Sequence, residues 1–359
     1  MAKTFLITGG AGFVGANLAA EIASRDEASR VVILDDFRTG SFRNITAAHA
    51  RRGLPPFSGS VVPEGIETVE WHDVVAEVAP AAIFHLAAIT DTTVTDEAEM
   101  LAINTEPFVG MRDAAAAFDV PLVYASSAAT YGSPAAGSER APFTEAMAGA
   151  PSNVYGFSKW LMECEHRRAH DAAITASDAP NWVVGLRFFN VFGPGENNKA
   201  HMASMVHQLA VQLLDGKSPR LFADGSQARD QIPVEDVVDG LLVAAGYPPS
   251  TGSADPKGFV KRVGVTPGVY NLGSGRATSF NDIIAAIRRA LDLGPAELET
   301  EYFEMPGHIR RFYQDFTQAD MTAAHAGLRW RPARDPVEHF EALARHLRDA
   351  RRTAELAST

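Results

Sequence analysis

The stretch TGGAGFVG, residues 8–15, decides how the N-terminal half of this chain is organised. It follows the short apolar run KTFLIT and opens a segment with helical periodicity, which is the context of a dinucleotide-binding turn. Gly9 makes the tight turn, Gly12 lets the backbone approach a pyrophosphate, and Gly15 lets the helix pack on the strand. The helix N-terminus then attracts the negative charge of the pyrophosphate. The predicted cofactor contacts in this turn are Gly9, Gly12, Phe13, Val14 and Gly15.

The next strand-like run, RVVILDD, ends in two aspartates. Asp35 lies about twenty residues beyond the glycine turn, where an acid accepts hydrogen bonds from the adenosine ribose hydroxyls. Asp36 adds a second negative charge that repels a 2′-phosphate, whereas Arg38 and Arg43 are near enough in sequence to attract one. We therefore predict NAD as the cofactor and keep NADP as the alternative.

Short apolar runs alternating with helical stretches continue along the chain. AAIFHLAA and VPLVYASS are two further buried-strand patterns, with a helical stretch between them. This alternation predicts an α/β fold, a Rossmann-type parallel sheet with helices on both faces. Beyond residue 190, Pro/Gly-rich interruptions indicate a smaller C-terminal substrate lobe. We expect residues 1–190, with returning segments about 232–262 and 312–335, to form the dinucleotide-binding domain, and residues 191–231 and 263–311 to form the substrate lobe.

Composition limits the classes of function. The 359-residue chain has 46% hydrophobic and 21% charged residues, as in ordinary globular proteins, and a net charge of −12. Nucleic-acid binders and polybasic membrane binders need a positive surface, so neither partner is expected. Cys164 is the one cysteine, which excludes an internal disulfide and a cysteine-based zinc site and suits the reducing cytoplasm. No apolar run approaches a membrane span, and no metal site is predicted.

A second motif, SNVYGFSKW, places Tyr155 and Lys159 four positions apart. On a helix these two residues share a face. A lysine ammonium favours the phenolate and lowers the pKa of tyrosine, which can then take a proton from a substrate hydroxyl while hydride leaves the adjoining carbon. Ser127, at a strand end, is placed to hydrogen-bond the same oxygen. An exposed helical pair without a catalytic role is the alternative.

The chain resembles the extended short-chain dehydrogenase/reductase family in several sequence blocks and in their order along the chain. The matching blocks are TGGAGFVG, FHLAA, SSAATYG, YGFSK, RFFNVFGP, RDQIPVEDVVDG and YNLGSG. The resemblance implies that Tyr155 is the catalytic acid/base and that Lys159 also holds the nicotinamide ribose. The family's aspartate after the third strand has no clear match in VVPEGIETVEW. Further cofactor contacts implied by the resemblance are Leu86, Ala87, Ala88, Asn104 and Val191.

The family contains epimerases, dehydratases, decarboxylases and dehydrogenases. Related dehydratases carry an acidic residue just before the tyrosine–glycine pair of SSAATYG, where this chain has Ala128, Ala129 and Thr130. Elimination is therefore disfavoured, and removal and return of a hydride on one sugar is the expected chemistry. Two alternatives stay open, a UDP-sugar 4-epimerase or decarboxylase of the same family and a cofactor-sensing protein without activity.

The stretch FNVFGPGENNKAHMASM, residues 189–205, most resembles a subgroup of this family, the ADP-L-glycero-D-manno-heptose 6-epimerases. That resemblance implies interconversion of the D-glycero and L-glycero forms of the ADP-heptose at C6. Turning the ketone intermediate over brings its oxygen to a new partner, so a second base is useful, and Lys199 stands at that position. An exposed loop lysine is the alternative.

The same resemblance implies the rest of the site. Phe42 stands where a phosphate-binding lysine would favour NADP, which supports NAD. We expect a nucleotide-sugar substrate and a homo-oligomeric assembly. The predicted catalytic residues are Ser127, Tyr155, Lys159 and Lys199, and the further substrate contacts are Asn190, His201, Gln208, Phe222, Arg229 and Tyr313.

Overall fold

The large sheet is parallel throughout. The computed structural model describes residues 2–133, 140–176, 181–249, 264–294, 297–307 and 313–357. Within these ranges the sheet has seven strands in the order β10-β6-β5-β4-β1-β2-β3. The order reverses between β1 and β4, which is the switch point where ligands bind in such sheets. The strands are β1 Thr4–Thr8, β2 Arg30–Leu34, β3 Ser60–Val62, β4 Ala82–His85, β5 Leu122–Ser127, β6 Val183–Phe188 and β10 Gly268–Leu272.

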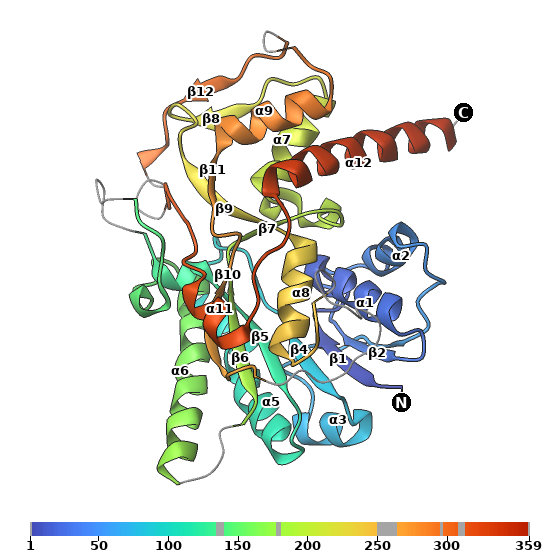
Figure 1. Cartoon of the computed structure of the whole chain (residues 1–359), viewed down its shortest axis with the longest axis vertical. Coiled ribbons are helices and arrows are strands. Elements are labelled where there is room, and N and C mark those ends of the chain that lie inside the picture. The colour runs from blue at the N-terminus through green and yellow to red at the C-terminus, as the bar shows by residue number, and fades with distance from the viewer. Residues whose placement is uncertain are drawn as a thin grey trace.

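Helices cover both faces of this sheet (Figure 1). Successive residues of a strand point to opposite faces, so each strand contributes to two cores. Phe5 and Ile7 of β1 pack in one core with α1 and α8, whereas Leu6 packs in the other with α3, α5 and α6. The predicted Rossmann-type fold is confirmed. The helices are α1 Phe13–Arg25, α2 Phe42–Arg51, α3 Trp71–Val78, α4 Glu97–Asn104, α5 Glu106–Ala117, α6 Val154–Thr175 and α8 Val234–Ala244.

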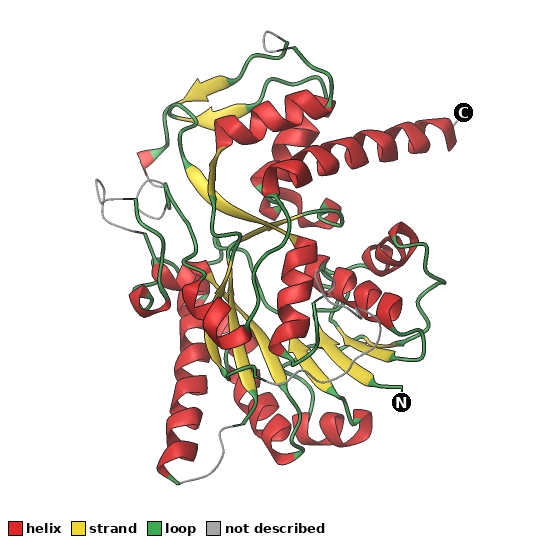
Figure 2. Ribbon diagram, viewed as in Figure 1, coloured by secondary structure: helices red, strands yellow, loops and turns green. Residues whose placement is uncertain are grey.

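A smaller lobe has its own apolar core. Phe192 and Leu221 pack there with side chains of α7, α9 and α12. Two small sheets, β11-β9-β7 and β12-β8, lie beside these helices (Figure 2). Their strands are β7 Asn190–Phe192, β8 Arg220–Phe222, β9 Ala228–Pro233, β11 Ala277–Ser279 and β12 Glu301–Phe303. The helices are α7 Met205–Leu214, α9 Phe280–Ala290 and α12 Pro336–Ala357, and α11 Thr322–Leu328 lies against β10.

The chain returns to the large sheet at a place that differs from the expected boundary. β10 pairs with β6 in parallel at the edge of the large sheet. It falls within 263–311, the range expected to belong to the smaller lobe. Its partner β6 lies far back in the chain, and no local pattern reports that pairing. Residues 250–263 and 308–312, which overlap the ends of the expected returning segments, lie outside the described residues.

No helix within the described ranges is long and apolar enough to cross a membrane.

Candidate functional site

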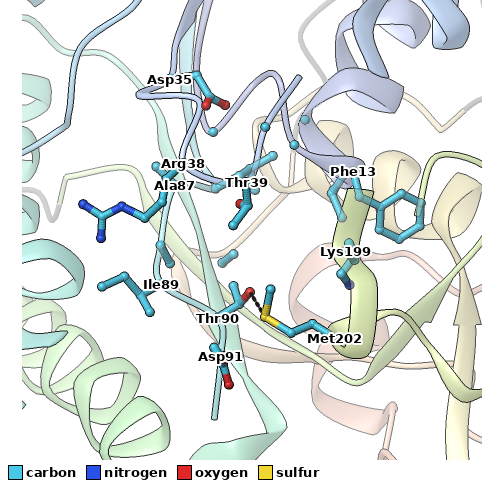
Figure 3. Close-up of a pocket in the computed structure, with 18 of the residues that line it drawn as sticks. Phe13, Asp35, Arg38, Thr39, Ala87, Ile89, Thr90, Asp91, Lys199 and Met202 are labelled. Carbon is cyan, nitrogen blue, oxygen red and sulfur yellow. Dashed lines mark hydrogen bonds between the residues drawn. The ribbon is translucent and has the colours of Figure 1, made fainter. Parts of the chain in front are cut away.

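A cavity of about 650 Å³ lies at the carboxyl ends of the parallel strands. Residues that follow β1 to β6 form its wall, together with the segment that precedes α7. Figure 3 shows Asp35 and Ala87 at one part of this wall and Lys199 at another. The predicted site residues that line the cavity are Gly9, Gly12, Phe13, Val14, Gly15, Asp35, Asp36, Leu86, Ala87, Ala88, Ser127, Tyr155, Lys159, Asn190, Val191 and Lys199.

The glycine turn needs its glycines for reasons of space. Gly9 has a φ of +68°, and a Cβ there would lie 2.6 Å from the backbone nitrogen of Ala87. A Cβ on Gly15 would lie 2.3 Å from the carbonyl oxygen of Gly9, so the helix can approach the turn only with glycine there. Gly12 is the N-cap of α1 and lines the cavity, which leaves the first amide groups of that helix available to an anion.

Asp35 is buried at the end of β2 and is held by the backbone. Its carboxylate accepts hydrogen bonds from the amide of Ala11 at 2.8 Å and from that of Phe37 at 2.9 Å. Burial raises the pKa of Asp35, and these backbone hydrogen bonds oppose the rise. Two oxygens carry more lone pairs than these two donors use, so the carboxylate can still accept from a ribose hydroxyl.

Of the two arginines that could attract a 2′-phosphate, Arg43 does not line the cavity and Arg38 is already paired. Arg38 lines the cavity, but its guanidinium lies 3.4 Å from Asp36 and 3.4 Å from Glu99. Phe42 stacks on Phe37 at 4.7 Å between ring centroids and is largely exposed. This corner of the cavity therefore presents carboxylates together with an arginine that they neutralise.

The segment after β3 supplies wall residues that the sequence did not place. Glu64, Gly65, Ile66 and Glu67 all line the cavity. Ile66 is buried and belongs to the core shared with α3. Glu64 and Gly65 thus occupy the position after the third strand where the family has an aspartate. The apolar residue Ile66 that follows them is the sequence feature that marks this position.

Asn104 lies behind the cavity wall. Its side-chain amide accepts from the amide of Ile89 at 2.8 Å and donates to the carbonyl of Ile89 at 2.9 Å. It also donates to the hydroxyl of Ser158 at 3.1 Å. The resemblance implied a cofactor contact, but in the structure this residue joins the loop after β4 to α6.

Tyr155 and Lys159 share one face of α6, as predicted, and both reach the cavity. The helix begins at Val154 because Asn153 caps it, accepting from the amide of Gly156 at 2.8 Å. The Lys159 amine lies 6.0 Å from the centroid of the tyrosine ring and is buried, which lowers its pKa to about 8.

The predicted direction of the Tyr155 pKa is wrong. Burial raises the pKa of Tyr155, and a hydrogen bond from Ser127 is what opposes that rise. Burial disfavours the phenolate because it removes the hydration shell of the negative charge. Ser127 is fixed at the end of β5, where its hydroxyl accepts from the amide of Ala129 at 3.1 Å.

A buried ionic network, absent from the sequence analysis, supports the strand end that carries Ser127. Arg187 donates to both carboxylate oxygens of Glu163, at 2.9 and 2.7 Å. The neighbouring hydroxyl of Ser126 donates to Glu163 at 2.6 Å. Arg187 also donates to Tyr131, which donates to Asn271 of β10 at 2.5 Å. Strands β5, β6 and β10 are therefore tied together directly behind the site.

Lys199 lies in the short 3-10 helix Asn197–Met202. Its amine lies 5.3 Å from the centroid of the Phe13 ring, beside the glycine turn (Figure 3). Burial lowers the pKa of Lys199, and the negative charge of Glu196 opposes the fall. Ala200 adopts a φ of +47°, which is unusual for a residue with a Cβ. The loop is thus held in a specific conformation that places the amine at the cavity.

Glu196 holds this loop in place. It is fully buried, and its carboxylate accepts from the amide of Gly193 at 3.1 Å. It also accepts from the amide and the hydroxyl of Ser204, at 2.6 and 2.8 Å. Sequence reasoning missed this residue because the partners lie on both sides of the loop and come together only when it folds.

His201 and Gln208 do not line the cavity. His201 is exposed, with its ring nitrogen 3.3 Å from Asp91, and Gln208 donates to the carbonyl of Ala203 at 2.6 Å. Next to His201, Met202 lies 3.9 Å from the hydroxyl of Thr90, and Figure 3 shows this contact across the cavity. His201 and Met202 therefore hold the Lys199 loop against the segment that contains Thr90 and Asp91.

Phe222, Arg229 and Tyr313 form a second cluster in the smaller lobe. The Arg229 guanidinium lies 4.9 Å from the centroid of the Tyr313 ring, and Tyr313 meets Phe222 edge-on at 5.6 Å. Burial lowers the pKa of Arg229. A buried guanidinium beside a pair of aromatic rings, the nearer of which is Tyr313, suits an anion attached to a flat group. No described group of three or more His, Cys, Asp or Glu side chains could hold a metal ion.

Comparison with known proteins agrees with this geometry. The model of the NAD dependent epimerase/dehydratase family matches residues 5–273. The ADP-L-glycero-D-manno-heptose-6-epimerase of Cupriavidus pinatubonensis is 33% identical over 335 residues, 88% of this chain and 90% of that protein.

Solved structures give the same relationship. The ADP-L-glycero-D-manno-heptose-6-epimerase of Helicobacter pylori superposes with a TM-score of 0.76 at 30% identity, covering 96% of each chain. MoeE5 in complex with UDP-glucose and NAD superposes with a TM-score of 0.70 at 25% identity, covering 97% of this chain and 99% of the other. The resemblance drawn from the sequence is confirmed, and this chain belongs to the NAD dependent epimerase/dehydratase family.

Proposed function

We propose that the protein is a nucleotide-sugar epimerase that interconverts ADP-D-glycero- and ADP-L-glycero-D-manno-heptose at C6, using a tightly bound NAD. The observation that carries this proposal is that Tyr155 and Lys199 line one cavity together with the glycine turn. A second proton-transfer group beside the cofactor site is useful for inverting an alcohol carbon, because the oxygen meets a new partner once the ketone has turned over. The similarity to ADP-heptose epimerases supports the choice of sugar.

The glycine turn, Asp35 and the alanines after β4 would hold the cofactor, which supplies a hydride acceptor that later returns the same hydride. Tyr155 takes the hydroxyl proton of one C6 isomer as the alcohol becomes a ketone, while Ser127 donates a hydrogen bond to the same oxygen. After the ketone turns over, the Lys199 ammonium gives a proton to the oxygen of the opposite isomer. The reverse reaction uses the same groups in reverse order, with neutral Lys199 as the base.

Proton transfer by Lys199 is favoured by its surroundings. Burial lowers its pKa, so a larger fraction of the amine is neutral near pH 7 than for an exposed lysine. The raised pKa of Tyr155 keeps that residue protonated and ready to donate to the ketone oxygen. The two shifts thus favour the direction of reaction in which neutral Lys199 takes the hydroxyl proton and protonated Tyr155 donates to the ketone oxygen.

NAD is favoured over NADP at the ribose corner. Asp35 and Asp36 place two carboxylates there, and Arg38 is neutralised by Asp36 and Glu99. Like charges make a 2′-phosphate costly at this position. In the smaller lobe, the Arg229 cluster would receive the diphosphate and the base. Cys164 as the one cysteine is in keeping with the cytoplasm as the site of the reaction.

The proposal is tested by NMR with the purified protein and a panel of ADP-, UDP-, GDP- and dTDP-sugars. The expected result is exchange of the C6 stereoisomers of the ADP-heptose without release of NADH, since the hydride returns to its substrate. Stoichiometric NADH production would identify a dehydrogenase instead. Selective inversion of a UDP-sugar at C4 would support the second candidate, a UDP-sugar 4-epimerase. The similarity to MoeE5, which was solved with UDP-glucose and NAD, supports testing UDP-sugars.

A further inference from the structure

Unsatisfied polar atoms gather on one face of the small sheet β11-β9-β7. Among the described residues, seven buried side-chain nitrogen or oxygen atoms have no hydrogen-bond partner. Four of them belong to Gln227, Arg229, Gln231 and Thr278. The first three alternate along β9 and the residue before it, and Thr278 pairs with Arg229 in register. Because alternate and paired residues point to the same side, all four side chains share one face.

This face leads from the cavity to the Arg229 cluster. Gln231 pairs in register with Asn190, and Asn190 lines the cavity. At the other end, Gln227 donates to the carbonyl of Phe222 at 2.9 Å, and the Phe222 ring meets Tyr313 beside Arg229. Gln231 does not itself line the cavity; along this face it lies between Asn190, which does, and the Arg229 cluster. Figure 1 labels the three strands β7, β9 and β11 that carry the face.

The order of donors and acceptors along this face matches one kind of ligand. Alternate residues of a strand lie roughly 6.6 Å apart, so one extended ligand can contact both Arg229 and Gln231. The unused atom of Arg229 is the donor Nε, which suits a phosphate oxygen. The unused atom of Gln231 is the acceptor Oε1, which a phosphate without a proton cannot satisfy but a sugar hydroxyl can.

We propose that Gln231 is a substrate-binding residue whose amide oxygen accepts a hydrogen bond from a hydroxyl of the sugar, between the reacting carbon and the diphosphate. The inference rests on the proposed function and deepens it, because it assigns the residue that reads the sugar rather than the nucleotide. Gln231 is 1% exposed, and burying an amide oxygen without a partner costs free energy. A hydroxyl of the bound sugar removes that cost only when substrate is present.

The test compares Kd values for ADP and for ADP-mannose, whose C6 has no stereocentre to invert, with the full-length protein holding its cofactor. Gln231→Met keeps the length of the side chain and removes its polar atoms. We expect the variant to bind ADP with the same Kd as the wild type. Its Kd for ADP-mannose should rise about tenfold, which corresponds to the loss of one net hydrogen bond to the sugar. Its Tm should equal or exceed that of the wild type.

Gln318→Met is the matched control, because the Gln318 amide is already used and donates to the carbonyl of Gly275 at 2.9 Å. It should lower the Tm and leave the sugar contribution unchanged. Gln231→Asn shortens the side chain by one methylene group and so withdraws the amide. It should also lose the extra affinity that the sugar gives ADP-mannose over ADP, and it serves as the test if Gln231→Met does not fold.

Three results overturn the inference: an unchanged sugar contribution in Gln231→Met, an equal loss of affinity for ADP and ADP-mannose, or a fall in Tm like that of Gln318→Met. The same comparison with UDP and UDP-glucose separates this inference from the proposed function. If the protein binds UDP and UDP-glucose but not ADP and ADP-mannose, the ADP-heptose proposal fails. The role of Gln231 is then decided by whether Gln231→Met loses affinity for UDP-glucose and keeps its affinity for UDP.

Discussion

Replacing Lys199 by methionine removes the amine from the cavity and keeps most of the apolar stem against Phe13. The lost proton-transfer group should lower the rate of epimerisation by roughly a hundredfold to ten-thousandfold, the usual range for general acid/base catalysis. Stability should change little. The contact of the amine with the Phe13 ring contributes about 0.5–1 kcal/mol, and its loss is offset because a partly buried ammonium no longer has to be desolvated.

The assay follows two quantities from each C6 isomer separately, the epimerisation rate by NMR and the single-turnover reduction of bound NAD by absorbance. Lys199→Met should still reduce NAD from the isomer whose oxygen meets Tyr155, and should fail with the other. Lys217→Met is the control, since the Lys217 side chain is 70% exposed and pairs with Asp215 on the surface. Near-wild-type epimerisation in Lys199→Met would refute the two-base mechanism.

The pH dependence gives a separate check. Burial lowers the pKa of Lys199, so the neutral amine is formed at lower pH than in an exposed lysine. NAD reduction from the isomer served by Lys199 should therefore rise with pH as the amine loses its proton, and the other isomer should lack this limb. A limb shared equally by both isomers would place its origin in another group.

Three further predictions concern the same site. Tyr155→Phe should retain the fold and the cofactor and lower turnover by roughly a hundredfold or more, and full activity by NMR would exclude the tyrosine from the mechanism. Burial lowers the pKa of Lys159 from 10.5 to about 8, so between these values the folded protein binds fewer protons than the unfolded chain and stability rises with pH; denaturant titrations should show this rise, and Lys159→Met should abolish it. Glu196→Ala leaves the buried donors of Gly193 and Ser204 unpaired, so it should cost about 1–3 kcal/mol in the free energy of unfolding and slow epimerisation, and unchanged values of both would remove its anchoring role.

The parts that sequence reasoning placed correctly depend on local spacing. The glycine turn fixes its own geometry, because Gly9 and Gly15 are the residues whose Cβ atoms would meet backbone. The helical repeat brings Tyr155 and Lys159 to one face whatever surrounds them. Asp35 follows from its position at a strand end.

The parts that sequence reasoning missed depend on pairing between distant segments. Burial, which no local pattern reports, reverses the expected pKa shift of Tyr155. Glu163 and Arg187 are 24 positions apart and meet only because α6 packs on the sheet. β10 is short and joins an edge, so its membership in the large sheet follows from partners far away in the chain.

The late position of β10 also constrains biosynthesis. A nascent chain that has emerged only as far as β6 presents that strand as an open edge, with unpaired backbone amides and carbonyls. The guanidinium of Arg187 on β6 lacks its full set of partners until Asn271 arrives and fixes Tyr131. Domains generally fold in order of synthesis, so the half-finished sheet is the species most exposed to aggregation and to chaperone capture. Release from that state waits until β10, Gly268–Leu272, has been synthesised and can pair with β6.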